Sequence, residues 1–128
     1  MSEYSTKGKN VVADFYDCQN DISLDDMMIM REVTKIAISK SNATLIQMNS
    51  HKFEPQGLTI TAIISESSLD LHTYPEHKFF SVSFYTCGDD ADPLLGIQYL
   101  DKYFEPTRKN IAVITRGDNE MKIEKVTL

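Results

Sequence analysis

The sequence predicts an α+β fold, a two-layer α/β sandwich in which helices cover one face of a mainly antiparallel sheet. Four short segments rich in β-branched and aromatic residues follow one another between residues 44 and 87. Two further segments have the apolar spacing of helices that bury a single side. A chain of 128 residues is expected to form one domain, residues 1–128, with one helical layer on its sheet.

The first element is expected to be a strand at residues 10–17, where β-branched and aromatic residues partly alternate with other types. A helix should follow from about Leu24 to Ser41. Ser23 is the expected N-cap residue, and Asp26 stands three residues later in capping-box register. The expected apolar stripe of this helix consists of Met27, Met30, Val33, Ile36 and Ala37.

The middle of the chain is expected to form four strands, which Gly57, Pro75 and Gly88 punctuate. These strands are predicted at residues 44–53, 58–65, 68–74 and 79–87. Two helices against an antiparallel or mixed sheet give the two-layer sandwich, in which the uncovered face of the sheet meets solvent or another subunit.

The last part of the chain is predicted to contain one more helix and one more strand. Asp92 is a suitable N-cap residue, and Pro93 suits the first helical position. The apolar face of this helix is predicted to contain Leu94, Leu95, Ile97, Leu100 and Phe104. A strand is expected at residues 110–115, and the charged tail beyond Gly117 is expected to be loosely held.

The composition argues against several kinds of partner. A formal charge of −6 is unsuited to nucleic acid, whose binding depends on Lys and Arg contacts with phosphates. We expect no membrane partner and a cytoplasmic location, because no apolar stretch could span a bilayer and residues 1–10 are polar. No metal site is expected, because the histidines lack acidic or thiol partners at ligand-like spacing. Cys18 is expected to lie in the core.

The most informative segment contains a serine directly after a glutamate at a junction between two predicted strands. Ser67 follows Glu66, His72 comes five residues after Ser67, and Cys87 comes fifteen residues after His72. A hydroxyl can attack a neighbouring carbonyl, an imidazole can accept a proton and a thiol can donate one. On the residues alone, the ordinary interpretation is that Ser67 is a turn serine, His72 a solvated or hydrogen-bonded strand histidine and Cys87 a structural thiol.

In the order and spacing of several short motifs, the chain resembles the prokaryotic S-adenosylmethionine decarboxylase proenzyme family. The motifs are Phe15-Tyr16-Asp17-Cys18, His51-Lys52-Phe53, Pro55-Gln56-Gly57, the segment 65–75 and Phe84-Tyr85-Thr86-Cys87-Gly88. This resemblance runs from Val11 to about Gly117. It implies self-cleavage between Glu66 and Ser67 into a β chain, residues 1–66, and an α chain, residues 67–128, whose first residue becomes a pyruvoyl cofactor.

The resemblance also implies roles for individual residues. It implies that His72 takes the α-proton of Ser67 during processing, that Cys87 protonates the product, and that Thr59 supports cleavage where the family commonly has serine. It further implies that Phe53 and Leu69 line a nucleoside pocket and that Glu76 holds the ribose hydroxyls. Finally, it implies a homodimer in which two sheets stack face to face, giving four αββα layers with two active sites near the interface.

The leading hypothesis is therefore decarboxylation of S-adenosylmethionine, a small-molecule substrate, for spermidine synthesis. One alternative keeps the pyruvoyl cofactor but uses ornithine or arginine, with Ser68 and Asp70 as the altered positions and Asp70 answering a distal cation. Another alternative is an unprocessed, non-catalytic homologue that acts as a binding partner.

Overall fold

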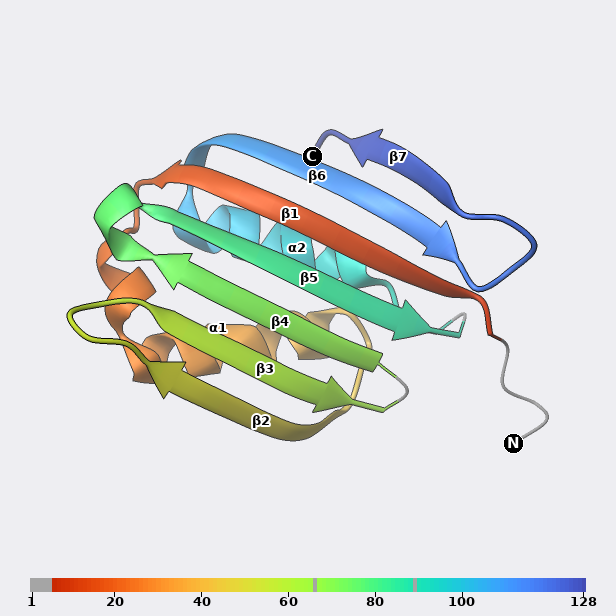
Figure 1. Ribbon diagram of the computed structural model, residues 1–128, viewed down its shortest axis with the longest axis horizontal. Helices are drawn as coiled ribbons and strands as arrows, with labels where there is room; N and C mark the ends of the chain where they lie inside the picture. The colour runs from red at the N-terminus through yellow and green to blue at the C-terminus, as the bar shows by residue number, and fades with distance from the viewer. Residues whose placement is uncertain (1–5, 66, 89) are drawn as a thin grey trace.

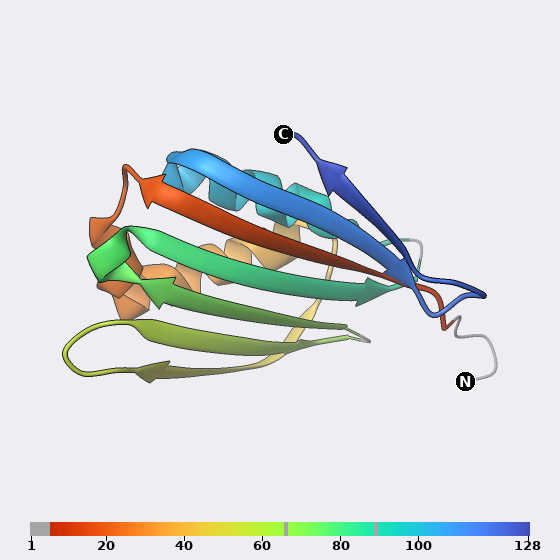
Figure 2. The same cartoon turned by 45° about the horizontal axis from the view of Figure 1, so that its top comes forward.

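The computed structural model describes residues 6–65, 67–88 and 90–128. In this part of the chain, seven strands form one antiparallel sheet, and helices α1 and α2 lie together against one of its faces (Figures 1 and 2). The strands are β1 Gly8–Cys18, β2 Leu45–Lys52, β3 Leu58–Ile64, β4 Ser67–Tyr74, β5 Phe79–Cys87, β6 Pro106–Arg116 and β7 Lys122–Val126. The predicted two-layer α+β class is confirmed, while the αββα dimer stays a prediction.

The strands lie in the order β2-β3-β4-β5-β1-β6-β7, so the first strand of the chain is inserted between two later ones. Val11 of β1 is paired with Phe84 of β5 on one side and with Val113 of β6 on the other. Successive side chains of a strand point to opposite faces of the sheet. In β5, for example, Phe80, Val82, Phe84 and Thr86 are buried, while the residues between them are half-buried.

Helix α1, Met27–Lys40, begins three residues later than Leu24. Asp26 is its N-cap residue, and its carboxylate accepts a hydrogen bond from the Ile29 amide at 3.0 Å. The expected cap at Ser23 is wrong, because residues Ile22–Asp25 form the separate 3-10 helix η1 and the Ser23 hydroxyl donates to Asn20 Oδ1 at 3.1 Å. A carboxylate in extended backbone next to the helix is the better-placed acceptor.

Helix α2, Pro93–Phe104, begins as expected, with the Asp92 carboxylate accepting a hydrogen bond from the Leu94 amide at 3.1 Å. It packs on α1 through Gly96, whose amide donates to Ser41 Oγ at 2.9 Å. A side chain at Gly96 would meet the Ala37 carbonyl. Since the helix contact runs through Gly96, Leu95 turns away from the core and is 45% exposed, so its predicted place on the apolar face is wrong.

The C-terminal segment is more ordered than expected. Strand β6 begins at Pro106 rather than near residue 110, and it pairs with β1 along almost its whole length. Residues Lys122–Val126 form β7, in which Glu124 is paired with Val113 of β6. The expectation of a loosely held tail is therefore wrong. Charged side chains are compatible with a strand at the edge of a sheet, where they face water.

The hydrophobic core lies between the helices and the sheet. Its largest fully buried side chains are Phe15, Phe80, Phe84, Phe104, Leu24, Met30, Ile38, Leu58, Ile60, Ile64, Leu69 and Leu71. None of the described helices is long and apolar enough to cross a membrane.

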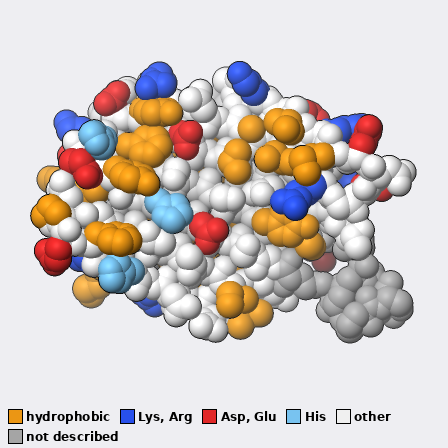
Figure 3. Space-filling view, viewed as in Figure 1, with side chains coloured by type: hydrophobic (Ala, Val, Ile, Leu, Met, Phe, Trp, Pro, Cys, Tyr) orange, Lys and Arg blue, Asp and Glu red, His pale blue; other side chains and the backbone are white. Residues whose placement is uncertain are grey.

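The side of the sheet turned away from α1 and α2 is called the open face here. It carries the alternate side chains of each strand, among them Thr59, Asp70, His72, Ser81 and Tyr85. Figure 3 looks onto this face, where hydrophobic groups are separated by histidine and acidic side chains. The predicted site residues Thr59 and His72 lie on this face, where a ligand or a second sheet can approach them.

Candidate active site

Thr59 and His72 form the best-defined polar pair on the open face. They are directly paired across strands β3 and β4, and Thr59 Oγ1 lies 3.1 Å from His72 Nδ1. With the ring proton on Nε2, the hydroxyl donates to Nδ1 and fixes the orientation of the imidazole. A neutral imidazole held in this way can accept a proton from a neighbouring group.

A recess of about 390 Å³ adjoins this pair. It is bounded by the loop between β2 and β3 on one side and by the end of β4 with the 3-10 helix η2, Pro75–His77, on the other. Its polar and aromatic lining consists of Phe53, Gln56, Thr59, His72, Thr73, Tyr74 and Glu76. Phe53 is 47% exposed, and its ring lies 4.6 Å from that of His51. An exposed ring, an imidazole and a carboxylate around one recess suit a ligand with a flat base and hydroxyl groups.

Ser67 and Cys87 lie near each other at the opposite end of the sheet, on the neighbouring strands β4 and β5. Ser67 is the first residue of β4 and is half-buried. Ser68 is paired with Tyr85 of β5, and Cys87 lies two residues beyond Tyr85. Glu66, the residue before the expected cleavage point, lies outside the described residues.

The Cys87 thiol is half-buried on the open face and lies 3.4 Å from the Tyr85 hydroxyl, to which it donates. This hydrogen bond, followed by partial burial, raises the pKa of Tyr85. The Tyr85 ring lies across Gly8, where any side chain would collide with the hydroxyl, and the Arg116 guanidinium carbon is 5.4 Å from the ring centroid. The Cys87 thiol thus lies beside a hydroxyl whose ring packs on Gly8 and near Arg116.

The two groups of predicted catalytic residues are separated within one chain. His72 comes five residues after Ser67 on an extended strand, so their backbones are about 16 Å apart at about 3.3 Å per residue. Ser67 and His72 are separated by five positions, an odd number, so their side chains also point to opposite faces of the sheet. The structure therefore brings Ser67 near Cys87 and His72 near Thr59, but it does not bring Ser67 and His72 together.

Leu69 does not lie in the recess with Phe53 and Glu76. It is fully buried in the core and is paired with Phe84. The alternation of β4 explains this position, because Leu69, Leu71 and Thr73 point toward the helices while His72 points to the open face. As expected, Cys18 also lies in the core, where burial and then the charges of nearby aspartates raise its pKa to about 12.

The structure adds a second recess that the sequence analysis did not single out. This recess of about 520 Å³ is lined by Asp14, Tyr16, Tyr74, His77, Phe79 and Ser81. The Arg108 guanidinium carbon lies 3.7 Å from the centroid of the Tyr16 ring, and the Phe79 ring lies 4.9 Å from it. Tyr16 could have been found from its place in the first motif combined with strand alternation.

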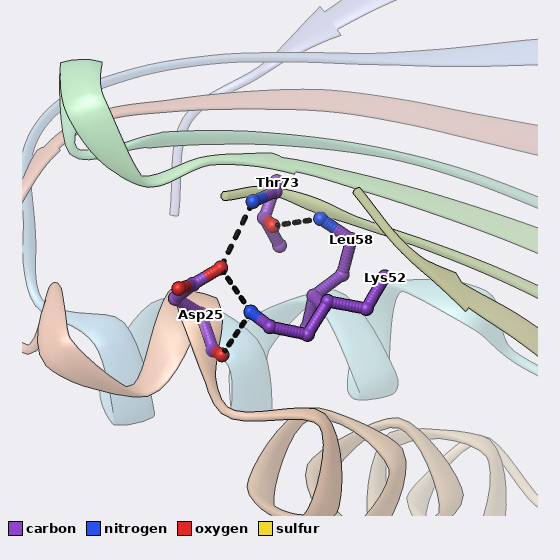
Figure 4. A network of polar contacts seen from close by, with 5 residues as sticks. Asp25, Lys52, Leu58 and Thr73 are labelled. Atoms are coloured by element: carbon purple, nitrogen blue, oxygen red, sulfur yellow. Dashed lines mark hydrogen bonds and ion pairs between the residues drawn. The ribbon is translucent and has the colours of Figure 1, made fainter. Parts of the chain in front are cut away.

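A network around Asp25 was also missed (Figure 4). The Asp25 carboxylate accepts a hydrogen bond from the Gly57 amide at 2.9 Å and lies 2.7 Å from Lys52 Nζ. The sequence placed Asp25 near the start of the predicted helix. No sequence pattern indicated that Asp25 contacts the β2–β3 loop. Among the described residues, no group of three or more His, Cys, Asp and Glu side chains is arranged to hold a metal ion.

Comparison with known proteins connects this geometry to one family. The family model described as S-adenosylmethionine decarboxylase matches residues 9–117. The S-adenosylmethionine decarboxylase proenzyme of Thermosipho melanesiensis is 37% identical over 110 residues, covering 86% of this chain and 84% of that protein. The S-adenosylmethionine decarboxylase proenzyme 2 of Halalkalibacterium halodurans is 35% identical over 120 residues, covering 94% of each.

A solved structure agrees with these sequence relationships. The crystal structure of the adenosylmethionine decarboxylase from Aquifex aeolicus superposes with a TM-score of 0.82 at 29% identity, covering 91% of this chain and 95% of that chain. The resemblance inferred from the short motifs is confirmed, and with it the expectation that the chain is related to decarboxylases. The chain belongs to the S-adenosylmethionine decarboxylase family.

Proposed function

We propose that this chain is a self-processing proenzyme that decarboxylates S-adenosylmethionine for spermidine biosynthesis, using a pyruvoyl group generated from Ser67. The observation that carries the proposal is the Thr59–His72 hydrogen bond of 3.1 Å in the wall of a recess that also holds Phe53 and Glu76. This arrangement combines a proton acceptor with groups that suit a nucleoside. Family membership supports the same reaction.

Processing begins at Ser67 with a rearrangement that neither adds nor removes atoms. The Ser67 hydroxyl adds to the Glu66 carbonyl carbon, the peptide C–N bond breaks, and an ester replaces the amide while the Ser67 amine is freed. A base then removes the α-proton of Ser67, which expels the Glu66 carboxylate and leaves dehydroalanine. Tautomerisation and hydrolysis release ammonia and leave a pyruvoyl group at the start of the α chain.

The surroundings of Ser67 fit such a group. Ser67 is half-buried at the start of β4, and Cys87 presents a thiol at the same end of the neighbouring strand. When present, the pyruvoyl ketone supplies an electron sink that becomes conjugated to the substrate amine. The role of Cys87 is to hold a proton close to the carbon atom that loses its carboxylate.

Processing by His72 requires a second copy of the chain. Because Ser67 and His72 are about 16 Å apart in one chain, His72 of the partner subunit is the base that acts on Ser67. A two-fold dimer through the open faces would set the Ser67–Cys87 end of each sheet against the Thr59–His72 end of the other. For this step the Ser67 side chain, at the first position of β4, would have to turn toward the open face. Exposed apolar side chains on this side, Ile63 and Tyr74 among them, support such an αββα stack.

The recess suits the nucleoside part of the substrate. Phe53 offers a face for the adenine ring, and Glu76 offers a carboxylate for the ribose hydroxyls. The sulfonium is a fixed cation and is attracted to aromatic rings such as that of Tyr74. One observation favours a second candidate substrate: Asp70 is exposed on the open face two residues from His72, where it could hold the distal cation of ornithine or arginine.

Denaturing mass spectrometry followed by an activity assay tests this function. The purified chain should appear as two fragments that meet between Glu66 and Ser67, and the processed protein should release carbon dioxide from S-adenosylmethionine. Release from ornithine or arginine alone would support the second candidate. An intact chain without activity would point to a non-catalytic binding protein.

A further inference from the structure

The loop between β2 and β3 forms one wall of the proposed substrate recess. It carries Phe53 and Gln56, and it ends at Gly57, whose φ of +105° is a conformation that side chains rarely adopt. The Phe53 amide donates to the Gly57 carbonyl at 2.8 Å and closes the loop on itself. What orients this loop relative to the rest of the fold therefore determines where the Phe53 ring stands.

A single carboxylate from the helical layer holds both ends of this loop (Figure 4). Asp25, the last residue of η1, accepts from the Gly57 amide at 2.9 Å and lies 2.7 Å from Lys52 Nζ. Lys52 Nζ also donates to the Asp25 carbonyl at 3.0 Å. Lys52 directly precedes the loop and Gly57 is its last residue, so Asp25 contacts both the beginning and the end of the loop.

The opposite wall of the recess is joined to the loop by a separate contact. The Leu58 amide, next to Gly57, donates to Thr73 Oγ1 at 2.9 Å, and Thr73 directly precedes Tyr74 in β4 (Figure 4). Asp25 itself does not line the recess. Its influence on a ligand would therefore pass through Lys52 and Gly57 to Phe53.

We infer that Asp25 is a positioning residue that sets substrate affinity by holding the Phe53 loop in its binding position. This inference rests on the proposed function, because it takes the recess as the site of the nucleoside. A carboxylate at position 25 suits this role, because it accepts hydrogen bonds from the Lys52 ammonium and from the Gly57 amide at the same time. A carboxylate held by two donors is ionised at neutral pH, and both donors lower the pKa of Asp25.

The chain contains a matched ion pair outside the recess. Lys109 Nζ lies 2.8 and 2.9 Å from the two carboxylate oxygens of Asp101 and joins β6 to α2. The Asp101 side chain is 18% exposed, against 36% for Asp25. Because exposed ion pairs contribute little to stability, the loss of Asp101 should destabilise the fold at least as much as the loss of Asp25. Asp101→Asn is therefore the control for a purely structural effect.

The experiment compares wild type, Asp25→Asn and Asp101→Asn as full, self-processed proteins. We expect Asp25→Asn to raise KM for S-adenosylmethionine about five-fold or more, with kcat and the extent of processing changed by less than about two-fold. Binding of 5′-methylthioadenosine, a nucleoside that lacks the amino-acid part of the substrate and its α-amine, should weaken by a similar factor in calorimetry. Asp101→Asn should leave both quantities unchanged. Equal KM values in the two variants, or a parallel loss of kcat, processing and melting temperature in both, would overturn the inference.

Amide hydrogen exchange makes the test independent of the substrate. Peptides covering residues 53–57 should exchange faster in Asp25→Asn than in wild type or Asp101→Asn. If wild type turns over only ornithine or arginine, the proposed nucleoside function fails, and the same KM comparison made with that amino acid still decides the role of Asp25. Unchanged exchange in residues 53–57 would overturn the inference whatever the substrate proves to be.

Discussion

Thr59 Oγ1 and His72 Nδ1 lie 3.1 Å apart across two neighbouring strands, on the face of the sheet turned away from the helices. The hydroxyl and the imidazole hold each other in place, whereas Ser67, the residue on which both are proposed to act, lies about 16 Å along the strand. The proposed chemistry consequently divides into parts that individual substitutions can separate.

Replacing His72 by alanine should stop processing after the ester has formed, because the imidazole is the proposed acceptor of the Ser67 α-proton. The variant should be intact by denaturing mass spectrometry, and hydroxylamine, which attacks esters, should release two fragments from it. Ser67→Ala serves as the control and should stay intact with or without hydroxylamine. Normal maturation of His72→Ala would contradict the assigned role.

Processing in a dimer should be rescued by mixing two inactive chains. When His72→Ala and Ser67→Ala are co-expressed with different tags, mixed dimers contain one complete pair, with Ser67 from one chain and His72 from the other. The His72→Ala chain should then be cleaved and the Ser67→Ala chain should stay intact in mass spectra of the isolated mixed dimer. Cleavage of neither chain in that dimer would argue that both residues act within one subunit.

Loss of the Cys87 thiol should affect turnover more than processing. Cys87→Ala should be cleaved to nearly the same extent as wild type, while kcat should fall by about 100-fold or more, the scale of a lost general acid. A time course of cleavage and a carbon dioxide assay on the same preparation measure the two effects. Cys18→Ala, which alters a core thiol, should lower the melting temperature and leave kcat nearly unchanged. Equal loss of processing and turnover in Cys87→Ala would count against a proton-donor role.

Removing the Phe53 ring should weaken use of S-adenosylmethionine. Phe53→Ala should cost roughly 1–3 kcal/mol in kcat/KM, the scale of one lost base–aromatic stack. Leu95→Ala is a suitable control, because Leu95 is 45% exposed, close to the 47% of Phe53, and lies in the helical layer. Steady-state kinetics on processed protein make the comparison, and equal kcat/KM for the two variants would exclude a stacking role for Phe53.

The Asp25 network should also leave a signature in the pH dependence of stability. The Lys52 hydrogen bond and then the Gly57 amide lower the pKa of Asp25 below its ordinary value of 3.8. A group with a lower pKa in the folded state stabilises the fold above its unfolded pKa and loses this contribution as pH falls through the folded pKa. In urea titrations, the difference in unfolding free energy between wild type and Asp25→Asn should be constant above about pH 5 and should shrink at lower pH. A difference that grows on acidification would show the opposite linkage.

Local sequence patterns were sufficient for most of the fold but not for all of its boundaries. Strands with clear alternation, such as β5, were placed correctly because side-chain period follows backbone geometry. Ser23 and Asp26 are both good caps, and only the packing of η1 decides between them. Strand β7 was missed because its charged residues depend on pairing with β6 rather than on intrinsic propensity.

The candidate site was predictable as a set of residues but not as an arrangement. The motifs indicated Thr59 and His72, and register alone pairs them across two strands. The separation of Ser67 from His72 follows from strand geometry once both are placed on β4. The contact between Asp25 and Gly57 spans 32 positions and has no local signal.

The insertion of β1 between β5 and β6 has a consequence for a chain that is cut before β4. The N-terminal piece would contain β1, β2 and β3. Its strand β1 would remain hydrogen-bonded to β5 and β6 of the C-terminal piece, and β3 would remain hydrogen-bonded to β4. Each piece alone would lack neighbours in the middle of its own sheet. The two fragments would therefore stay associated without a covalent link. Cleavage would create a new chain end for chemistry while the sheet around it keeps its structure.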